Sequence, residues 1–324
     1  MASLWEEINK FHDMSGFDLP AFDGRPVNRR YFVDGSNTTG RAGDGNDGLS
    51  FKRPLLTMSE VFTRMAVTEY DKPVGMLTDV YVMGVIKEQL VTPAGVFDVR
   101  IRGIANRPRQ ATSGGTATGG GSHWAPPASP TATTALLRII EQGWQLENIQ
   151  FLPHTSSSCI EIERNDGPPE RDGSHAIIRG CRLVGGTTAN GIVFKNGGYN
   201  CLIENNEFES LTGTAILSDG TSVQVPLFNK ILNNRFNGCT NSIAISSVRG
   251  FIVGNIFKQA ADDTNNKVNL VSVSAQGSDN MVLFNIFSDA AANITIAKGY
   301  KPGTTDVWRN WGTGAADAIV AVPT

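Results

Sequence analysis

The sequence contains few of the residues that build disulfide scaffolds or metal sites. Only four of its 324 residues are cysteine, at positions 159, 181, 201 and 239, and no two are spaced as C-x-x-C. The four histidines are scattered along the chain. Disulfide frameworks need a higher density of cysteine, and zinc sites need closely spaced Cys or His ligands. We therefore expect free thiols, no metal or other cofactor, and synthesis in a reducing cytoplasm.

Charge and long apolar runs are also scarce. Charged residues make up 18% of the chain and the net charge is −3, without the basic excess that nucleic-acid binding requires. No apolar run approaches the ~20 residues of a membrane helix. The first residues, "MASLWEEINKF", lack the basic and apolar regions of a secretory signal. The sequence thus predicts neither a nucleic-acid partner, nor a membrane span, nor export.

Glycine, by contrast, is abundant at 35 residues, and helical periodicity is confined to two short segments. This composition favours many short strands joined by tight turns. In the first helical segment Leu4, Ile8 and Phe11 form one apolar stripe. So short a helix is not stable alone, so residues 1–30 are interpreted as an arm that docks on its own domain or on a partner.

The second helical segment follows a loop that is rich in Gly, Asn and Asp. Thr57 and Glu60 form a capping box, and apolar residues follow at helical spacing, namely Met58, Val61, Phe62 and Met65. In the preceding loop, Asp44, Asn46 and Asp47 allow two interpretations. They weakly resemble a calcium loop, but they equally fit the side-chain-to-backbone bonds of Asx-turns.

Residues 107–134 are rich in Gly, Pro, Ser and Thr and are predicted to form a long exposed loop. His123 and Trp124 lie within it, in "SHWAPP". An exposed Trp could stack on a sugar ring or contact a neighbouring subunit. It could equally fold back and cover the side of its own domain. His123 and Trp124 are therefore candidate contact residues for a glycan or a subunit.

From Leu136 onward the chain repeats a phrase of apolar residues, an Asn or Gly, and a Phe or Leu. The phrase ends at Phe151, Leu183, Phe208, Phe236, Phe257 and Phe287, at intervals of 32, 25, 28, 21 and 30 residues. A second apolar strand follows, marked by Ile160, Ile192, Ile216, Ile243 and Leu270. Such a period without helices predicts a solenoid of parallel strands that stack about 4.8 Å apart, one turn of chain per repeat.

The recurring asparagine is interpreted as structural. A coil must bend sharply between strands, and Asn tolerates the left-handed backbone conformation that such a bend requires. Stacked Asn amides can also bond from coil to coil. The predicted ladder consists of Asn148, Asn205, Asn233, Asn255 and Asn285, with Asn206 and Asn234 as alternatives in their repeats and Gly180 in the equivalent position of another. The Phe that follows should point into the coil.

These features together resemble the right-handed parallel β-helix proteins of the pectate-lyase-like superfamily. The opening "YFVDGSNTTG", the segments "TPAGVFDVRIRG" and "GTTDVWRNW", and the capped helix are similar to β-helix virion proteins of tailed bacteriophages. The resemblance implies an all-β, single-stranded right-handed parallel β-helix. Its parts would be an arm (1–30), a cap with a capping helix (31–80), the coil (81–290, with the 107–134 loop) and a C-terminal cap (291–324).

No catalytic residue is predicted, although enzymes of this superfamily act on polysaccharides. Glycosidic cleavage by acid and base needs two carboxylates about 5–10 Å apart. Glu161 and Glu163 alternate with apolar residues and should point outward, but the next repeat places Val193 and Lys195 beside them. Glu207 is expected to pair with Arg235 on the surface. These patterns indicate ion pairs in place of an acidic active site.

The sequence therefore leads to three functional hypotheses. The first is a structural virion protein of a tailed phage: a tail spike or fibre component, or a capsid-surface decoration. It would be assembled in the host cytoplasm, anchored to other virion proteins through its arm, homotrimeric, and facing the host surface. The first alternative is a polysaccharide depolymerase of the tailspike type, so the sequence does not decide whether the protein is an enzyme. The second is a non-catalytic adhesin that binds host cell-surface polysaccharide.

Overall fold

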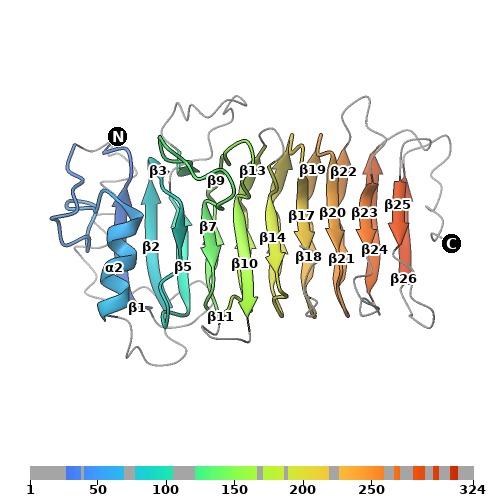
Figure 1. Ribbon diagram of the computed structural model, residues 1–324, viewed down its shortest axis with the longest axis horizontal. Coiled ribbons are helices and arrows are strands. Elements are labelled where there is room, and N and C mark those ends of the chain that lie inside the picture. Colours follow the sequence, from blue (N-terminus) through green and yellow to red (C-terminus); the bar gives the residue numbers. More distant parts are fainter. Residues whose placement is uncertain are drawn as a thin grey trace, which may run out of the picture.

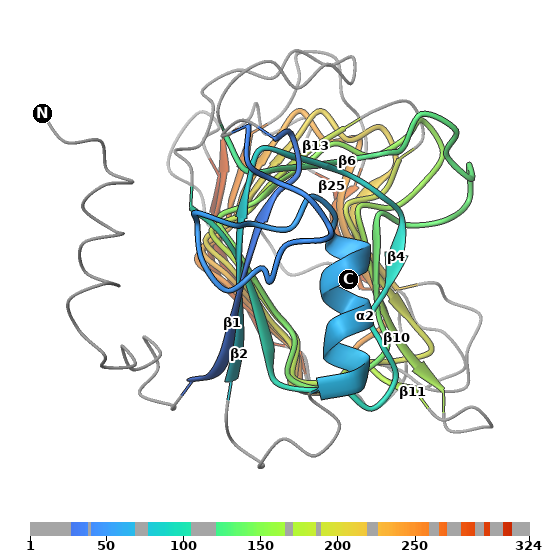
Figure 2. The same ribbon diagram turned by 90° about the vertical axis from the view of Figure 1, so that its left-hand side faces the viewer.

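In the computed structural model, short strands follow one another along a single stack, with one helix at its N-terminal end (Figure 1). Figure 2 looks along the stack: β1 and β2 line one side of the coil, β4 and β10 line another, and the helix α2 lies across the opening. The structure describes residues 27–37, 40–68, 77–104, 121–165, 171–185, 189–218, 226–258, 266–270, 280–288, 295–298 and 307–312.

Two parallel sheets run the length of the stack. The first contains β1 (Val27–Asp34), β2 (Leu77–Met83), β3 (Val85–Lys87), β5 (Val99–Gly103), β6 (His123–Ala125), β8 (Gln145–Glu147), β9 (Gln150–Phe151), β12 (Ile177–Arg179), β13 (Arg182–Val184), β15 (Leu202–Glu204), β16 (Glu207–Glu209), β18 (Lys230–Leu232), β19 (Arg235–Asn237), β21 (Phe251–Val253), β22 (Ile256–Lys258), β24 (Met281–Ser288) and β26 (Val307–Gly312). The second contains β4 (Leu90–Val91), β7 (Leu137–Ile139), β10 (Ile160–Asn165), β14 (Ile192–Lys195), β17 (Thr214–Ser218), β20 (Asn241–Ile245), β23 (Asn266–Leu270) and β25 (Thr295–Lys298). The two-residue β11 (Arg171–Asp172) pairs antiparallel with β10.

The strand register confirms the predicted repeat. Each residue that ends the recurring phrase is the lateral partner of the one that ends the next, from Phe151 through to Phe287. In the second sheet, Ile160, Ile192, Ile216 and Ile243 are partners in the same way. The last marker was wrong by two residues, because Leu270 pairs with Ile245. The predicted all-β parallel β-helix is thereby confirmed.

The interior of the coil is filled by columns of apolar side chains. The rings of Phe208 and Phe236 stack with centroids 4.8 Å apart, as do those of Phe236 and Phe257. This separation equals the spacing of hydrogen-bonded strands, so each coil places its ring directly on the ring of its neighbour. The prediction that these Phe side chains point inward is confirmed for all three.

The helix α2 (Met58–Thr68) covers the N-terminal end of this core, as its sequence pattern predicts. Thr57 Oγ1 accepts a hydrogen bond from the Glu60 backbone N–H at 3.2 Å, which is one half of the predicted capping box. The other half is not formed, because the Thr57 N–H donates to Asp44 and the Glu60 carboxylate pairs with Arg64. The four predicted apolar residues of the helix, Met58, Val61, Phe62 and Met65, are all buried. A second acceptor comes from outside the helix, since the Glu88 carboxylate accepts the N–H groups of Met58 and Ser59 at 2.7 and 3.0 Å.

Glu88→Ala should lower the free energy of unfolding by about 1–2 kcal/mol, since the substitution leaves two helix N-terminal donors without their acceptor. Urea unfolding followed by circular dichroism measures the loss. Glu60→Gln is the matched control, because Glu60 only pairs with Arg64 one turn along the helix surface. We expect the control to change the value by about 0.5 kcal/mol or less. Equal losses in both variants would contradict a capping role for Glu88.

The coil also differs from the predicted boundaries at three places. The strand β1 begins at Val27, inside the predicted arm, while residues 1–26 lie outside the described part of the chain. The strands β25 and β26 extend both sheets beyond residue 290, so the coil continues into the segment that was predicted to be a C-terminal cap. Within the predicted loop 107–134, residues 123–125 form strand β6 of the first sheet.

Candidate functional site

The structure buries His123 and Trp124, which the sequence suggested as exposed contact residues. Trp124 is 0% exposed; its ring stacks on Phe151 with centroids 5.9 Å apart, and its indole N–H donates to the Glu88 carbonyl at 2.9 Å. The exposed loop was therefore wrong at these positions, because both residues belong to a strand that is paired on both sides. Of the alternatives that the sequence left open, packing against its own domain is the one observed.

His123 projects from the other face of β6, where it is 1% exposed. Within the described part of the chain, the ring nitrogens of His123 and the amide atoms of its lateral partner Gln150 are buried without a hydrogen bond of good geometry. Burial lowers the pKa of His123, and a weaker hydrogen bond with the Gly121 backbone acts in the opposite direction. The imidazole is consequently neutral at neutral pH, and it offers no charge to a surface ligand.

The predicted asparagine ladder is divided between two adjacent positions of each coil. The first position has a positive φ and is held by Asn148, Gly180, Asn205, Asn233, Gly254 and Phe284 in successive coils. The next position is buried and is held by Cys181, Asn206, Asn234, Asn255 and Asn285. The prediction that one asparagine performs both tasks was wrong. Asn148, Asn205 and Asn233 make the bend, whereas Asn255 and Asn285 belong to the buried ladder.

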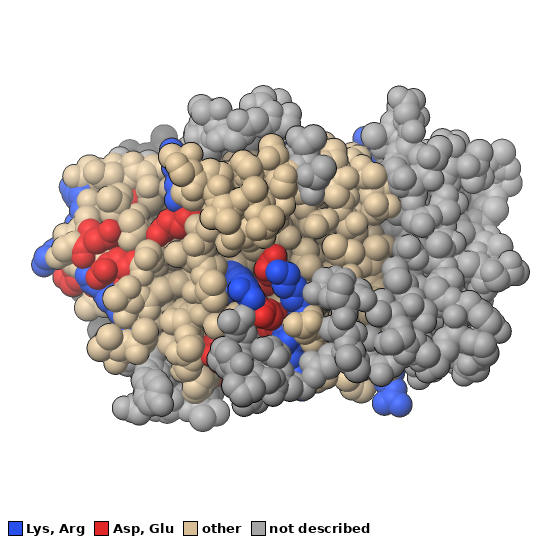
Figure 3. All heavy atoms as spheres, in the orientation of Figure 1, with Lys and Arg blue, Asp and Glu red and all other residues tan. Residues whose placement is uncertain are grey.

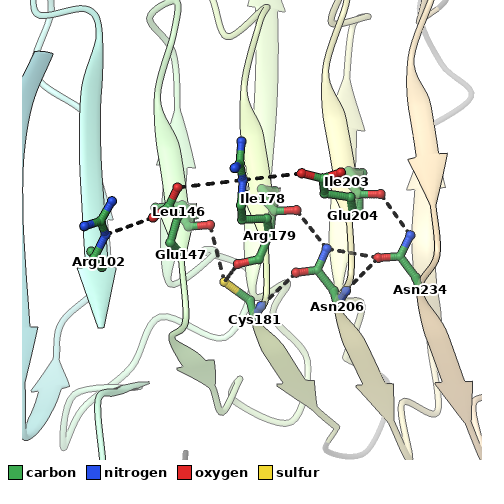
Figure 4. Close-up of polar contacts among 10 residues, drawn as sticks. All are labelled: Arg102, Leu146, Glu147, Ile178, Arg179, Cys181, Ile203, Glu204, Asn206 and Asn234. Atoms are coloured by element: carbon green, nitrogen blue, oxygen red, sulfur yellow. Dashed lines mark hydrogen bonds and ion pairs between the residues drawn. The ribbon is translucent and has the colours of Figure 1, made fainter. Parts of the chain in front are cut away.

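In the buried ladder each amide bonds to the coils on either side (Figure 4). Asn234 Oδ1 accepts the backbone N–H and the amide of Asn206 at 2.9 and 3.0 Å, while its own amide donates to the Ile203 carbonyl at 2.9 Å. Asn255 and Asn285 repeat this arrangement. At the N-terminal end of the ladder, the Cys181 backbone N–H donates to Asn206 Oδ1 at 2.9 Å. The ladder therefore satisfies backbone groups that the bend would otherwise leave unpaired.

A second buried ladder, which the sequence analysis missed, lies at another corner of the coil. The Cys201 N–H donates to Asn229 Oδ1 at 2.8 Å, and the Gly250 N–H donates to Asn280 Oδ1 at 2.9 Å. The amides of Asn229 and Asn280 donate in turn to backbone carbonyls. The signal was present in the sequence, because each Asn directly precedes an apolar strand, as in "FNKIL" and "DNMVL".

The four cysteines are free thiols and all are buried. Burial raises the pKa of Cys159 well above its usual range and that of Cys201 to about 12. Because the thiolate is the reactive form, Cys159 and Cys201 are poor nucleophiles at neutral pH.

Charged side chains alternate along one row of the first sheet's outer face (Figure 4). Glu147 is bridged to Arg102 at 2.9 Å and to Arg179 at 3.7 Å, and Arg179 also reaches Glu204 at 3.4 Å. The four residues occupy equivalent positions in successive coils. Partly exposed pairs of this kind contribute at most about 1 kcal/mol each, so the row is a modest stabilising feature.

Glu207 forms a different ion pair from the one predicted. Its carboxylate lies 3.6 Å from Arg182 of the preceding coil, which also binds Glu209. Arg235 is the lateral partner of Glu207 on the following coil, as the register predicted. The prediction of a Glu207–Arg235 pair was wrong because the Arg182 guanidinium lies between two carboxylates of β16 and binds both.

The densest charge cluster on the second sheet surrounds the predicted pair Glu161 and Glu163. Figure 3 shows charged side chains gathered at the α2 end and again midway along this face, over β7, β10 and β14. Both carboxylates are only 5% exposed. Glu161 lies 3.1 Å from Lys195, Glu163 bonds to Arg138, and the Arg138 Nε is 4.0 Å from Glu161. As residues i and i+2 of one strand, the two glutamates are spaced by about 7 Å along the backbone.

That spacing would suit acid–base cleavage of a glycosidic bond, but the surroundings differ from those of such a site. A general acid must hold its proton near neutral pH, usually through an apolar setting or a neighbouring like charge. A cation at hydrogen-bonding distance favours the ionised carboxylate. The cluster Arg138–Glu161–Glu163–Lys195 is therefore electrostatically balanced, with no group set apart as an acid.

In the loop that weakly resembled a calcium site, the polar side chains bond to backbone groups. Asp47 Oδ1 accepts the Leu49 N–H at 3.0 Å, which is an Asx-turn. Asp44 accepts the more distant N–H groups of Leu56 and Thr57, and the Asn46 amide donates to the Arg41 and Pro54 carbonyls. Within the described ranges, no three His, Cys, Asp or Glu side chains come together as metal ligands would. Among the same residues, no helix is both long and apolar enough to cross a bilayer.

Comparison with known proteins gives only distant similarities. No family model matches the chain, and no curated protein matches it. Among solved structures, a rhamnogalacturonan lyase is 12% identical with a TM-score of 0.44 over 87% of each chain. A GH136 lacto-N-biosidase from Eubacterium ramulus is 9% identical with a TM-score of 0.31, over 88% of this chain and 67% of that one.

A third similar structure is the tailspike protein gp49 from Acinetobacter baumannii bacteriophage Fri1, a capsular polysaccharide depolymerase. It is 10% identical with a TM-score of 0.25, over 91% of this chain and 63% of that one. At these TM-scores no property of the three proteins is transferred to this chain, and its fold is established by its own strand register.

Proposed function

We propose that this protein is a structural component of a tailed-phage particle, either a tail spike or fibre component or a decoration of the capsid surface. It faces the host, assembles in the host cytoplasm as a homotrimer, and attaches to other virion proteins through its N-terminal arm. The phage assignment is supported by the likeness of the "YFVDGSNTTG" opening and the capped helix to virion β-helix proteins.

The observation that carries a structural role is the pairing of the glutamates that project from the coil. Six of them, Glu147, Glu161, Glu163, Glu204, Glu207 and Glu209, are each in an ion pair with an Arg or Lys. Catalytic carboxylates need perturbed environments, whereas paired ones contribute to stability. Together with the buried amide ladders, this pairing favours a durable rod over an active site.

Mass spectrometry of purified, salt-washed particles from the phage that encodes this chain tests the proposal. The protein should be present at a copy number that matches a symmetric component, and the isolated chain should sediment as a trimer. Absence from washed particles would overturn the virion role. Monomeric sedimentation at micromolar concentration would overturn the trimer alone.

A polysaccharide depolymerase is the second candidate, favoured only by the spacing and burial of Glu161 and Glu163. For this function, reducing ends or unsaturated uronates should be released from acidic capsular polysaccharide, and Glu161→Gln or Glu163→Gln should lower the rate at least a hundredfold. From the balanced charges we expect no release by the unmodified protein. Release that Glu163→Gln abolishes, while Glu204→Gln leaves it intact, would establish the enzyme and remove the purely structural role.

A further inference from the structure

The outer face of the first sheet changes from charged to apolar toward the C-terminal end of the stack. In the row that holds the ion pairs of Arg102 and Glu147, Glu204 is followed by lateral partners without charge. The two neighbouring rows turn apolar after Lys230 and Arg235. These strands, β18, β21, β22 and β24, lie right of centre in Figure 1. We call the uncharged residues of the three rows the apolar face: Leu232, Phe251, Val253, Ile256, Met281, Leu283 and Ile286.

The apolar face is open to solvent. Ile256 and Ile286 are each 42% exposed and Met281 is 38% exposed, while the other four members are half-buried. Single apolar side chains on a surface are ordinary, but a contiguous patch of them marks a contact with another segment or molecule. From the spacing of strands and residues, the patch measures roughly 15 Å along the strands and about 10–15 Å across them.

The border of the apolar face is basic. Lys230, Arg235 and Lys258 are exposed there, and none of the three forms an ion pair in the part of the chain that the structure describes. The described residues between positions 226 and 312 include seven Lys or Arg and no Asp or Glu; the five Asp of this interval lie outside the described ranges. The charge of this border therefore favours an acidic occupant.

A second copy of the same face fits this surface poorly. Two copies would bring their basic borders together, and like charges across an interface oppose association. The patch covers roughly 200 Å² by the dimensions above, well below the ~800 Å² that each partner buries in a stable interface. A segment tethered to the coil needs less area, because the tether keeps it at an effective concentration in the millimolar range.

The N-terminal arm of the chain has the matching chemistry. Residues 1–26 contain five acidic residues and two basic ones. Leu4, Ile8 and Phe11 form the apolar stripe of the helix that the sequence predicts, and Glu7 lies beside this stripe at i+3 from Leu4. A helix of about eleven residues is about 16 Å long and 10 Å across, which matches the dimensions of the apolar face.

The arm is also long enough to reach the apolar face of its own chain. It joins the coil at Val27 in β1, and β21 follows β1 after seven lateral pairings, through β2, β5, β8, β12, β15 and β18. At about 4.8 Å per pairing the distance is about 34 Å. Residues 13–26, when extended, span up to about 46 Å. The helix that is predicted at the start of the arm can therefore lie on β21, β22 and β24.

We propose that the N-terminal arm docks on the apolar face of its own chain. The stripe of Leu4, Ile8 and Phe11 packs on the exposed side chains of β22 and β24, and the acidic residues of the arm lie toward the basic border. This inference goes beyond the proposed function and does not rest on it, because it concerns the free chain. Attachment to a particle through the arm then uncovers the apolar face.

Photocrosslinking of the full chain tests the proposal. Phe11 is replaced by benzoylphenylalanine, whose excited ketone inserts into nearby C–H bonds, and the crosslinked peptides are identified by mass spectrometry. The main crosslink should join the arm to a peptide that contains Ile256 or Met281. In a mixture of isotope-labelled and unlabelled protein, both halves of each crosslinked peptide should carry the same label, since the contact lies within one chain.

A double variant of the face, Ile256→Thr with Ile286→Thr, should lower the crosslink yield about tenfold. Thr keeps the β-branched shape that suits a strand but removes apolar contact area. Val91→Thr is the matched control, because Val91 is 43% exposed on β4 of the second sheet, and it should leave the yield unchanged. Crosslinks elsewhere on the chain, or an unchanged yield in the double variant, overturn the proposal. Crosslinks between differently labelled chains would place the arm on a second copy, which also overturns it.

Discussion

Asn234→Ala should lower the free energy of unfolding by about 3–5 kcal/mol, because it leaves buried groups on two coils without partners. Asn234 is 1% exposed. Its Oδ1 is the acceptor for the Asn206 backbone N–H, and its amide donates to the Ile203 carbonyl and to Asn255 Oδ1, the last at 3.1 Å. Urea unfolding followed by circular dichroism and by tryptophan fluorescence measures the loss.

The adjacent residue provides the control for this prediction. Asn233 has φ 54° and an exposed side chain, and its task is to make the bend. Asn233→Ala should cost about 1 kcal/mol, the penalty for a left-handed Ala, and Asn233→Gly should be close to neutral. Equal losses at positions 233 and 234 would contradict the division of roles between bend and ladder.

The repeat could be predicted from the sequence because its physical cause recurs in every coil. A ring such as Phe208 must stack on Phe236 and Phe236 on Phe257, so the interval between them marks one turn of chain whatever the lengths of the intervening loops. The division between bend and ladder was harder to predict. In "NN" at 205–206 and 233–234 either Asn fits either task, but "GN" at 254–255 already indicated that Gly makes the bend and the second residue forms the ladder.

The left-handed conformation of Phe228 and Arg249 could not be predicted, since it contradicts the preference of both residue types. Nothing in the letters around Phe228 or Arg249 indicates a left-handed backbone, and only the lateral register places them in line with Asn200. The surroundings of Glu161 and Glu163 could likewise be predicted only in part. Alternation with Ile160 and Ile162 correctly predicts the face from which they project, but not the Arg138 and Lys195 side chains that surround them.

The sequence could offer the burial of Trp124 only as one of several alternatives, because its strand is only three residues long and its flanks are typical of a loop. Gly119, Gly120 and Gly121 precede it and Pro126 and Pro127 follow, so composition averaged over the segment conceals the strand. The indole is positioned because β6 pairs with strands of the coils on both sides. The sequence of the segment itself does not indicate this pairing.

Trp124→Ala should therefore be among the most destabilising single substitutions in the chain, with a loss of about 3–5 kcal/mol. The side chain is fully buried, stacks on Phe151 and bonds to the carbonyl of Glu88, whose carboxylate caps α2. Trp124→Phe keeps a stacked ring and loses the N–H donor, so it should cost only about 1–2 kcal/mol. A loss below 1 kcal/mol in Trp124→Ala would contradict the role of the indole as a core residue.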